Sequence, residues 1–514
     1  MLKKIGKRSV AAVVLGTVLV ATGCGSNSVQ TSSSSSASNG NKVLNIGIQA
    51  DPPSLDPMTS SALVDRMVQN SIYDKLFDLD KDGKIVPMLA TSYETTDGKI
   101  YIIKLRTGIK FQDGTDFNAD AVKFNLERDM SKGSKRTGEL AMVQSVSVVD
   151  PSTVRIVLKK PFAPFISILA DRSGMMASPA AVKKYGSDYQ NHPVGTGPFV
   201  FVEHLKGDHV TLKRNDTYWN GKPKLSEVVF KVFADGSAAV QNLKSGMLDI
   251  VGPNVIPVRE IPTIKSDPNL SLVADAGMAF QGFYMNETIA PFNNQYLREA
   301  VDHAIDRNTI VKVLFNGYGA PAYSPFGPGD LAYGSSDKAP APNDGEIKDL
   351  LAKGGKPNGF SFTLEIPTTT IGEQFGTVIQ GMLKKYGINM KLEKTEFGTL
   401  ISNGNDGKFQ ALQLGWSGRP DPDQNIYDFV VTGQPENNAR ISDPKLDKLL
   451  NQARVELDNG KRKQLYDQAM VELHNNAGYT YIYHEYNIFG ISKKINGFTY
   501  VPDGIVRTAA IGKN

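Results

Sequence analysis

The stretch ATSYETTDGKIYIIKLRTGIKFQDGTDFNADAVKFNLER, residues 90–128, says most about the fold of this chain. Residues 100–105 (IYIIKL) form a short apolar run that predicts a β-strand. Residues 119–128 (ADAVKFNLER) predict a helix close behind it. A strand followed closely by a helix is typical of α/β proteins.

Strands and helices alternate along the rest of the chain as well. Residues 42–49 (KVLNIGIQ) place apolar side chains as a buried strand would, and prolines between residues 51 and 57 end this strand. A helical pattern follows at residues 63–76. This alternation predicts α/β lobes. Further strands are expected at residues 154–158, 199–202 and 209–213, and further helices at residues 179–185 and 296–315, from Asp443-Pro444 onward, and around residues 465–473.

Length and composition set the class of protein. A chain of 514 residues with 40% hydrophobic residues is globular and too long for one ordinary core, which indicates two to four domains or lobes. A single Cys excludes a disulfide framework. A sustained apolar run occurs only within the first ~20 residues, which excludes a polytopic membrane protein.

The net charge of +4 comes from the N-terminus. Residues 1–23 contain four Lys and Arg residues and no acidic residue, so the remainder is formally neutral. Nucleic-acid binding needs clustered Lys and Arg, and we therefore expect no nucleic-acid partner.

The N-terminus has the three-part pattern of a secretory signal, with basic residues 2–9, an apolar run at residues 10–20 and small residues before Cys24. The sole Cys at this place resembles a bacterial lipobox, although Ala21 stands where Leu is usual. Residues 1–23 are thus predicted to be a lipoprotein signal peptide. The Ser-rich residues 24–41 are predicted to be a flexible tether. A lipid on Cys24 would hold the protein at the outer face of the cytoplasmic membrane, at the cell surface or in a periplasm.

Motifs for catalysis are incomplete. Ser335 and Ser442 each begin a Ser-x-x-Lys sequence, but no Lys-Thr-Gly element accompanies them, and Gly-x-Ser-x-Gly is absent. The six His residues have no metal-ligand spacing. We therefore predict a protein that is not an enzyme and has no metal or cofactor, with an exported serine peptidase as a remote alternative. An acidic run at residues 78–83 lacks the final ligand of a calcium loop and predicts a hairpin turn at Asp82-Gly83.

Several short blocks, in a fixed order from about residue 43 to 505, resemble the family 5 solute-binding proteins of ABC importers, which include receptors for peptides, glutathione, opines and nickel. Each block alone is weak, and together they are specific. They are the segment at residues 90–128, PVGTGPF at residues 193–199, NDTYW at residues 215–219, SGMLDI at residues 245–250, the segment from Tyr284 to Arg307, and DPD at residues 421–423.

This resemblance implies a clamshell of the periplasmic-binding-protein type II class with an extra domain. Lobe I would consist of residues 42–81, 193–284 and 485–514. The extra domain would span residues 82–192 and lobe II residues 285–484. Strands crossing between the lobes would form a hinge, with residues 283–286 as one crossing.

The same resemblance implies a transport receptor. The lobes would close around a peptide by rotation at the hinge, and ligand would favour the closed state by binding it better. The closed form would then deliver the peptide to a membrane permease that an ATPase drives. The resemblance also implies a monomer.

The ligand class depends on residues 415–423. In peptide receptors of this family an Asp after a Gly-Trp element holds the ligand's ammonium, and here Arg419 stands at about that place. A guanidinium pairs with carboxylates and repels an ammonium. Asp421 could reach an ammonium or could be structural. Peptides remain the leading class, with glutathione, an opine or another carboxylate-rich solute as alternatives and a nickel chelate as a weaker one.

Other residues are candidates for the cleft wall. Trp416, between Gly415 and Ser417, could stack on a ligand. The hydroxyls of Ser60 and Ser61 could contact ligand, or these residues could cap the next helix. The crossing segment adds two candidates, Tyr284 and Asn286.

Overall fold

The computed structural model describes residues 42–514. The predicted signal segment, the lipidation site at Cys24 and the whole predicted tether lie outside the described residues. The alternation of helices and strands expected from the sequence is confirmed, and the chain has a mixed α/β fold.

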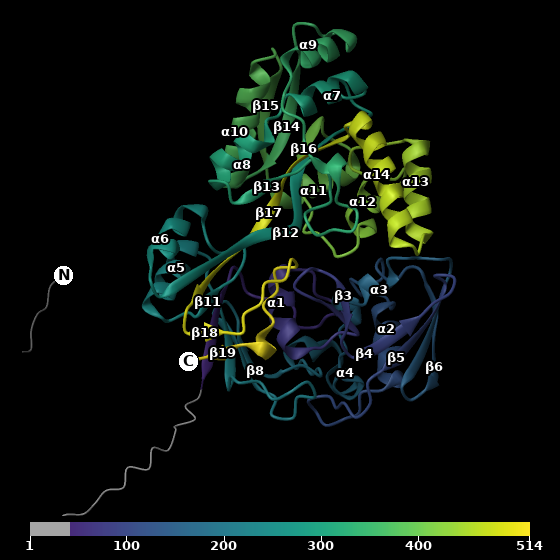
Figure 1. The fold of residues 1–514 in the computed structure, drawn as a ribbon, viewed down its shortest axis with the longest axis vertical. Coiled ribbons are helices and arrows are strands. Elements are labelled where there is room, and N and C mark those ends of the chain that lie inside the picture. Colours follow the sequence, from purple (N-terminus) through teal and green to yellow (C-terminus); the bar gives the residue numbers. More distant parts are fainter. Residues whose placement is uncertain (1–41) are drawn as a thin grey trace, which may run out of the picture. The chain divides into compact units, whose positions relative to one another are not determined.

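One large mixed sheet runs through the described chain (Figure 1). Its strands follow the order β15-β14-β16-β12-β17-β11-β1-β10-β9-β8, and β13 pairs with β17 outside this path. The strands are β1 (Val43–Ile48), β8 (Phe199–Leu205), β9 (His209–Arg214), β10 (Glu227–Val232), β11 (Ile250–Val251), β12 (Leu270–Met285), β13 (Gly319–Pro321), β14 (Ser361–Pro367), β15 (Asn389–Thr395), β16 (Ala411–Gln413) and β17 (Tyr479–Ser492).

Two long strands join the two halves of this sheet. Strands β12 and β17, of 16 and 14 residues, pair antiparallel along most of their length (Figure 1). One end of the pair adjoins β11, and the other adjoins β16. The ladder is interrupted in the middle, where three residues of β12, 277–279, lie between the pairs Ala276–Tyr486 and Phe280–His484. A second register shift lies between Gln281 and Gly282, so the pair is regular towards both ends and irregular at its centre.

Helices surround separate hydrophobic cores on either side of this pair. One core gathers β1, β8, β9, β10 and α1, and a second lies between α5, α6 and β11. Two further cores lie beyond β12, around β14 and β15 and around α12 to α14. The helices are α1 (Leu63–Ile72), α5 (Gly236–Ser245), α6 (Ile261–Ser266), α7 (Gln295–His303), α8 (Arg307–Phe315), α9 (Asp344–Lys353), α10 (Thr370–Lys384), α11 (Phe397–Asp406), α12 (Asp423–Val430), α13 (Pro444–Val455) and α14 (Asn459–Asn476).

A second, four-stranded sheet has its own core. Its strands β4 (Ala90–Glu94), β5 (Ile100–Leu105), β7 (Thr153–Leu158) and β6 (Val143–Asp150) are all antiparallel. Helices α2 (Ala119–Asp129), α3 (Phe165–Ile168) and α4 (Pro179–Tyr185) accompany it. Strands β2 (Phe77–Leu79) and β3 (Ile85–Pro87) form a hairpin around Gly83, which has a positive φ, so the hairpin turn expected at Asp82-Gly83 is confirmed.

The stretch at residues 90–128 is attached to the PVGTGPF turn through Gln112. Its side chain donates to the carbonyls of Ile72, Gly197 and Phe199 and accepts from the amide of Gly195. A Cβ on Gly197 would lie 2.6 Å from the backbone of Ile72, so only glycine fits this contact. Two of the recognisable sequence blocks therefore meet at the end of α1.

A third block meets the same place at Asp74, whose side chain is fully buried. Its carboxylate accepts hydrogen bonds from Thr196 Oγ1 at 3.0 Å, Tyr218 OH at 2.9 Å and Trp219 Nε1 at 2.7 Å. The PVGTGPF and NDTYW blocks are thus held together by one acidic side chain.

Two helices differ from the expected ones. The helix predicted at residues 63–76 ends at Ile72, because the carbonyl of Ile72 accepts from Gly197 N and Tyr73 turns to an extended conformation. The prediction of a single helix at residues 296–315 is wrong. This segment forms two helices, α7 and α8. Asp306 caps the start of the second helix by accepting a hydrogen bond from Thr309 N.

Candidate ligand-binding cavity

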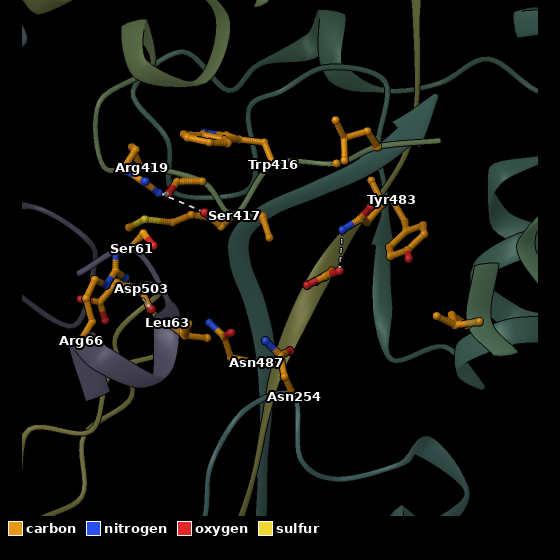
Figure 2. A pocket seen from close by; sticks show the side chains of 18 of the residues that line it. Ser61, Leu63, Arg66, Asn254, Trp416, Ser417, Arg419, Tyr483, Asn487 and Asp503 are labelled. Carbon is orange, nitrogen blue, oxygen red and sulfur yellow. Dashed lines mark hydrogen bonds between the residues drawn. The ribbon is translucent and has the colours of Figure 1, made fainter. Parts of the chain in front are cut away.

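A cavity of about 450 Å³ lies beside the β12–β17 pair. This volume is within the usual range of ligand sites, about 300–1,000 Å³. Its lining combines side chains from α1, from the crossing strands and from the segment after β16 (Figure 2). Its polar and charged members include Ser61, Arg66, Arg172, Asn254, Gln281, Gln413, Ser417, Arg419, Glu485, Asn487 and Asp503.

One wall is the Gly-Trp-Ser-Gly-Arg segment at residues 415–419. The backbone of Trp416 exchanges two hydrogen bonds of 3.0 Å with Phe280 on β12. Gly418 has a positive φ of 74°, and a Cβ there would lie 2.2 Å from the carbonyl oxygen of Met278. A Cβ on Gly415 would lie 2.2 Å from Gln281 Oε1. The two glycines allow this segment to lie directly against the crossing strand.

Asn425 on α12 fixes the direction of this wall. Its Oδ1 accepts from Trp416 Nε1 at 3.1 Å and from the amide of Arg419 at 2.8 Å, and its Nδ2 donates to the carbonyl of Arg419. The guanidinium of Arg419 stacks over the Trp416 ring at 4.5 Å and donates to Ser417 Oγ at 3.1 Å. Trp416 and Arg419 are therefore held as one unit facing the cavity.

Two guanidinium groups approach one carboxylate at this end of the cavity, and a third acts on it electrostatically. Arg66 Nη1 lies 3.0 Å from Asp171 Oδ2, and Arg419 Nε lies 3.8 Å from the same oxygen. Arg172, the next residue after Asp171, also lines the cavity. In Figure 2, Arg66 and Arg419 lie on facing sides, with Ser61 between them. The cluster carries more positive than negative charge.

The electrostatic effect of this cluster appears in two pKa values. Burial opposes ionisation of Asp171, but Arg66, Arg172 and Arg419 outweigh it and hold its pKa well below the usual range. Burial lowers the pKa of Arg172 to about 9, and the charges of Arg66 and Arg136 add to this effect despite Asp171. A bound anion would relieve the repulsion among these guanidinium groups.

The structure brings together five of the predicted site residues. Gly415, Trp416, Ser417, Arg419 and Ser61 all line the cavity. Arg419 lines the cavity and also approaches Asp171, which belongs to the segment expected to form the extra domain.

Two polar candidates lie elsewhere. Ser60 is buried, and its hydroxyl donates to Gln69 Oε1 at 3.3 Å instead of facing the cavity. Asp421 receives two hydrogen bonds from Arg462, of 2.6 and 2.7 Å, and its carboxylate is occupied in the core of α12 to α14. The structural alternative for Asp421 agrees with this position.

The crossing residues Tyr284 and Asn286 also lie away from the cavity. Tyr284 packs edge-on against Tyr479 in the core, and the Asn286 amide donates to the carbonyls of Gly407 and Phe409. Both residues stabilise the end of β12 beyond the cavity, because the crossing strands reach the cavity nearer their centre, at Met278 and Gln281.

Sequence reasoning missed Arg66, Arg172 and Glu485. No motif marks them, since each lies in a different segment and only the fold assembles them. Arg66 lies on α1, Arg172 follows α3, and Glu485 lies on β17. An arginine on the polar face of the helix predicted at residues 63–76 was the one available signal.

Comparison with known proteins identifies the family of this chain. Residues 84–438 match the family model described as "Bacterial extracellular solute-binding proteins, family 5 Middle". The chain belongs to this family. It is similar to the glutathione-binding protein GsiB of Escherichia coli, with 34% identity over 474 residues, which are 89% of this chain and 92% of the relative.

Two solved structures extend the comparison to the fold. HbpA2 from Haemophilus parasuis has a TM-score of 0.82 and 26% identity over 92% of this chain and all of that chain. The periplasmic binding protein DppA from Helicobacter pylori, in complex with the peptide STSA, has a TM-score of 0.78 and 26% identity over 92% and 98%. The fold is that of the type II periplasmic binding proteins of the dipeptide and oligopeptide group.

Family membership defines the class of activity. Family 5 members are extracytoplasmic, non-enzymatic receptors of ABC importers, so this chain binds a small solute and works with a permease and an ATPase. Residues 42–514 contain no helix that is long and apolar enough to cross a membrane. Within the same residues, no group of three or more His, Cys, Asp or Glu side chains is placed to hold a metal ion.

Proposed function

We propose that this family 5 receptor captures short peptides and peptide derivatives that are rich in carboxylates, with glutathione as the leading candidate. The ligand lies in the cavity between Arg66 and the Trp416–Arg419 wall and is passed unchanged to the permease. The three guanidinium groups around Asp171 carry this proposal, because they leave positive charge that a ligand carboxylate can neutralise.

The ligands of two similar proteins support this ligand class. GsiB is named as a glutathione-binding protein, and the DppA structure holds a peptide. The aromatic face of Trp416 and the exposed apolar side chains of Ile371 and Phe397 at the cavity suit the uncharged part of such a ligand. An opine or another acidic solute has the same carboxylate chemistry and remains the alternative. A nickel chelate would have to bring most of the metal's ligands with it.

A thermal-shift screen of the purified protein tests the ligand class. We expect glutathione and acidic di- and tripeptides to raise the unfolding temperature, since a ligand at 100 times its Kd stabilises the folded state by about 2.7 kcal/mol. Neutral sugars serve as the control and are expected to leave it unchanged. A protein that responds to neutral sugars but to no peptide, glutathione or opine would contradict the proposal.

The proposal includes membrane attachment through Cys24. The signal pattern and the position of the sole Cys support lipidation there, at the outer face of the cytoplasmic membrane. In cells, Cys24→Ser is expected to abolish incorporation of radiolabelled palmitate and to move the protein from the membrane fraction to the soluble fraction. Ser32→Ala in the tether is the matched control and is expected to change neither. Equal palmitate incorporation in wild type and Cys24→Ser would contradict this part.

The lobe boundaries stay part of the proposal, with lobe I as residues 42–81, 193–284 and 485–514, the extra domain as residues 82–192 and lobe II as residues 285–484. The separate cores on either side of the β12–β17 pair support this division. A monomer is proposed as the working state.

A further inference from the structure

A carboxylate without a cationic partner lies in the cavity at Glu485. It belongs to β17, and Tyr483, Glu485 and Asn487 all line the cavity because alternate residues of a strand face the same side. In Figure 2, Tyr483 and Asn487 lie on β17, away from the side that holds Arg66 and Arg419. The carboxylate and the arginine cluster therefore lie at different parts of one cavity.

The neighbours of Glu485 hold it but do not neutralise it. Its Oε1 accepts a hydrogen bond of 2.9 Å from Gln281 Nε2. Within residues 42–514 no Lys, Arg or His nitrogen comes within 4.0 Å of this carboxylate. Burial raises the pKa of Glu485, and the hydrogen bond from Gln281 opposes this only in part. A charged group supplied by a ligand would stabilise the ionised carboxylate.

The backbone around β12 and β17 positions the side chains of Glu485 and Gln281. Glu485 is the one β17 residue opposite the bulged residues 277–279 of β12, and bulges re-aim side chains near functional sites. Gly415 lies so close to Gln281 that a Cβ would approach its Oε1 to 2.2 Å. The Gly-Trp segment that carries Arg419 thus also fixes the side chain that positions Glu485.

We propose that Glu485, oriented by Gln281, binds the ammonium group of the ligand while the arginine cluster binds a carboxylate. This inference rests on the proposed function and names the second recognition element of the same cavity. The preferred ligands are then zwitterionic, with at least one further carboxylate.

Calorimetric titration of the purified protein under reducing conditions tests this assignment with two ligands, glutathione and glutaryl-cysteinylglycine, which lacks only the amino group. For the wild type we expect removal of the amino group to weaken binding at least tenfold. We expect Glu485→Gln to weaken glutathione at least tenfold and glutaryl-cysteinylglycine less than twofold. Glu365→Gln is the matched control, because Glu365 also accepts from an amide, Asn403 Nδ2, but does not line the cavity.

Equal losses for both ligands in Glu485→Gln, or no loss for glutathione, would overturn the inference while leaving the proposed function intact. Trialanine and acetyl-trialanine, which lacks the free ammonium group, test the case in which the proposed ligand class fails but the ammonium site does not. If the wild type binds trialanine but not glutathione, and Glu485→Gln weakens trialanine alone, the ammonium site stands and the carboxylate-rich ligand class fails. If the wild type binds none of the amine-bearing probes, the ammonium site is overturned.

Discussion

Replacing Arg419 with Ala is expected to weaken glutathione binding roughly 10- to 100-fold, the loss of one charge-assisted pair worth about 1.5–3 kcal/mol. Arg419 is held against Trp416 and Asn425, so its guanidinium is already directed at the cavity before ligand arrives. Arg419→Lys keeps the charge but loses the planar fork, and we expect an intermediate loss. Isothermal titration calorimetry with glutathione measures all three proteins.

The fold should tolerate this change, because Asp171 retains Arg66 as a partner at 3.0 Å. Arg259→Ala is a matched control, since its side chain is 74% exposed and lies outside the cavity. Undiminished affinity of Arg419→Ala for glutathione would remove Arg419 from the ligand site.

Replacing Asp74 with Ala is expected to lower the free energy of unfolding by about 3 kcal/mol at pH 7. The change leaves Thr196 Oγ1, Tyr218 OH and Trp219 Nε1 without their common acceptor. Chemical denaturation monitored by tryptophan fluorescence measures the loss. Asp216→Ala is the matched control in the same NDTYW block, and because Asp216 pairs with Arg214 at the surface, we expect a change below about 1 kcal/mol.

The difference between wild type and Asp74→Ala should depend on pH in a defined direction. Burial raises the pKa of Asp74 to about 6, against the lowering effect of its three hydrogen bonds. A carboxyl group whose pKa is raised in the folded state stabilises that state at low pH, and this contribution is lost as pH rises through about 6. The difference should therefore widen by about 1 kcal/mol between pH 7 and pH 5. If the difference in unfolding free energy between wild type and Asp74→Ala is smaller at pH 5 than at pH 7, the pKa of Asp74 is lowered and not raised in the folded protein.

Much of the fold could be predicted because its signals are local. Asp82-Gly83 forms the expected turn, and Asp443 and Ser178 cap the helices expected to begin at their prolines. The break between α7 and α8 was missed because apolar spacing continues across it, whereas the cap at Asp306 depends on one side chain. The early end of α1 could not be predicted, because it depends on Gly197, which lies far away in the chain.

The site was predictable only where its residues follow one another. Residues 415–419 carry a recognisable motif, and the structure places them at the cavity. Arg66, Arg172 and Glu485 come from three separate segments, and their common chemistry appears only after the chain is folded. Asp421 resembles a ligand-binding acid in sequence, but its charge is already neutralised by Arg462, a pairing that no local pattern reveals.

The bulge at residues 277–279 bears on the order in which the charged groups of a ligand bind. The ladder between β12 and β17 is interrupted at this point, although β13 pairs with β17 there, and we expect rotation of one half of the molecule against the other to be centred on the interruption. Atoms near a rotation axis move little, and Glu485 lies directly opposite the bulge. Arg66 and Arg419, on different segments farther along the cavity walls, would move apart as it opens. We therefore expect the ligand's ammonium group to bind Glu485 first. Its carboxylate would contact the arginine cluster only when the two halves close.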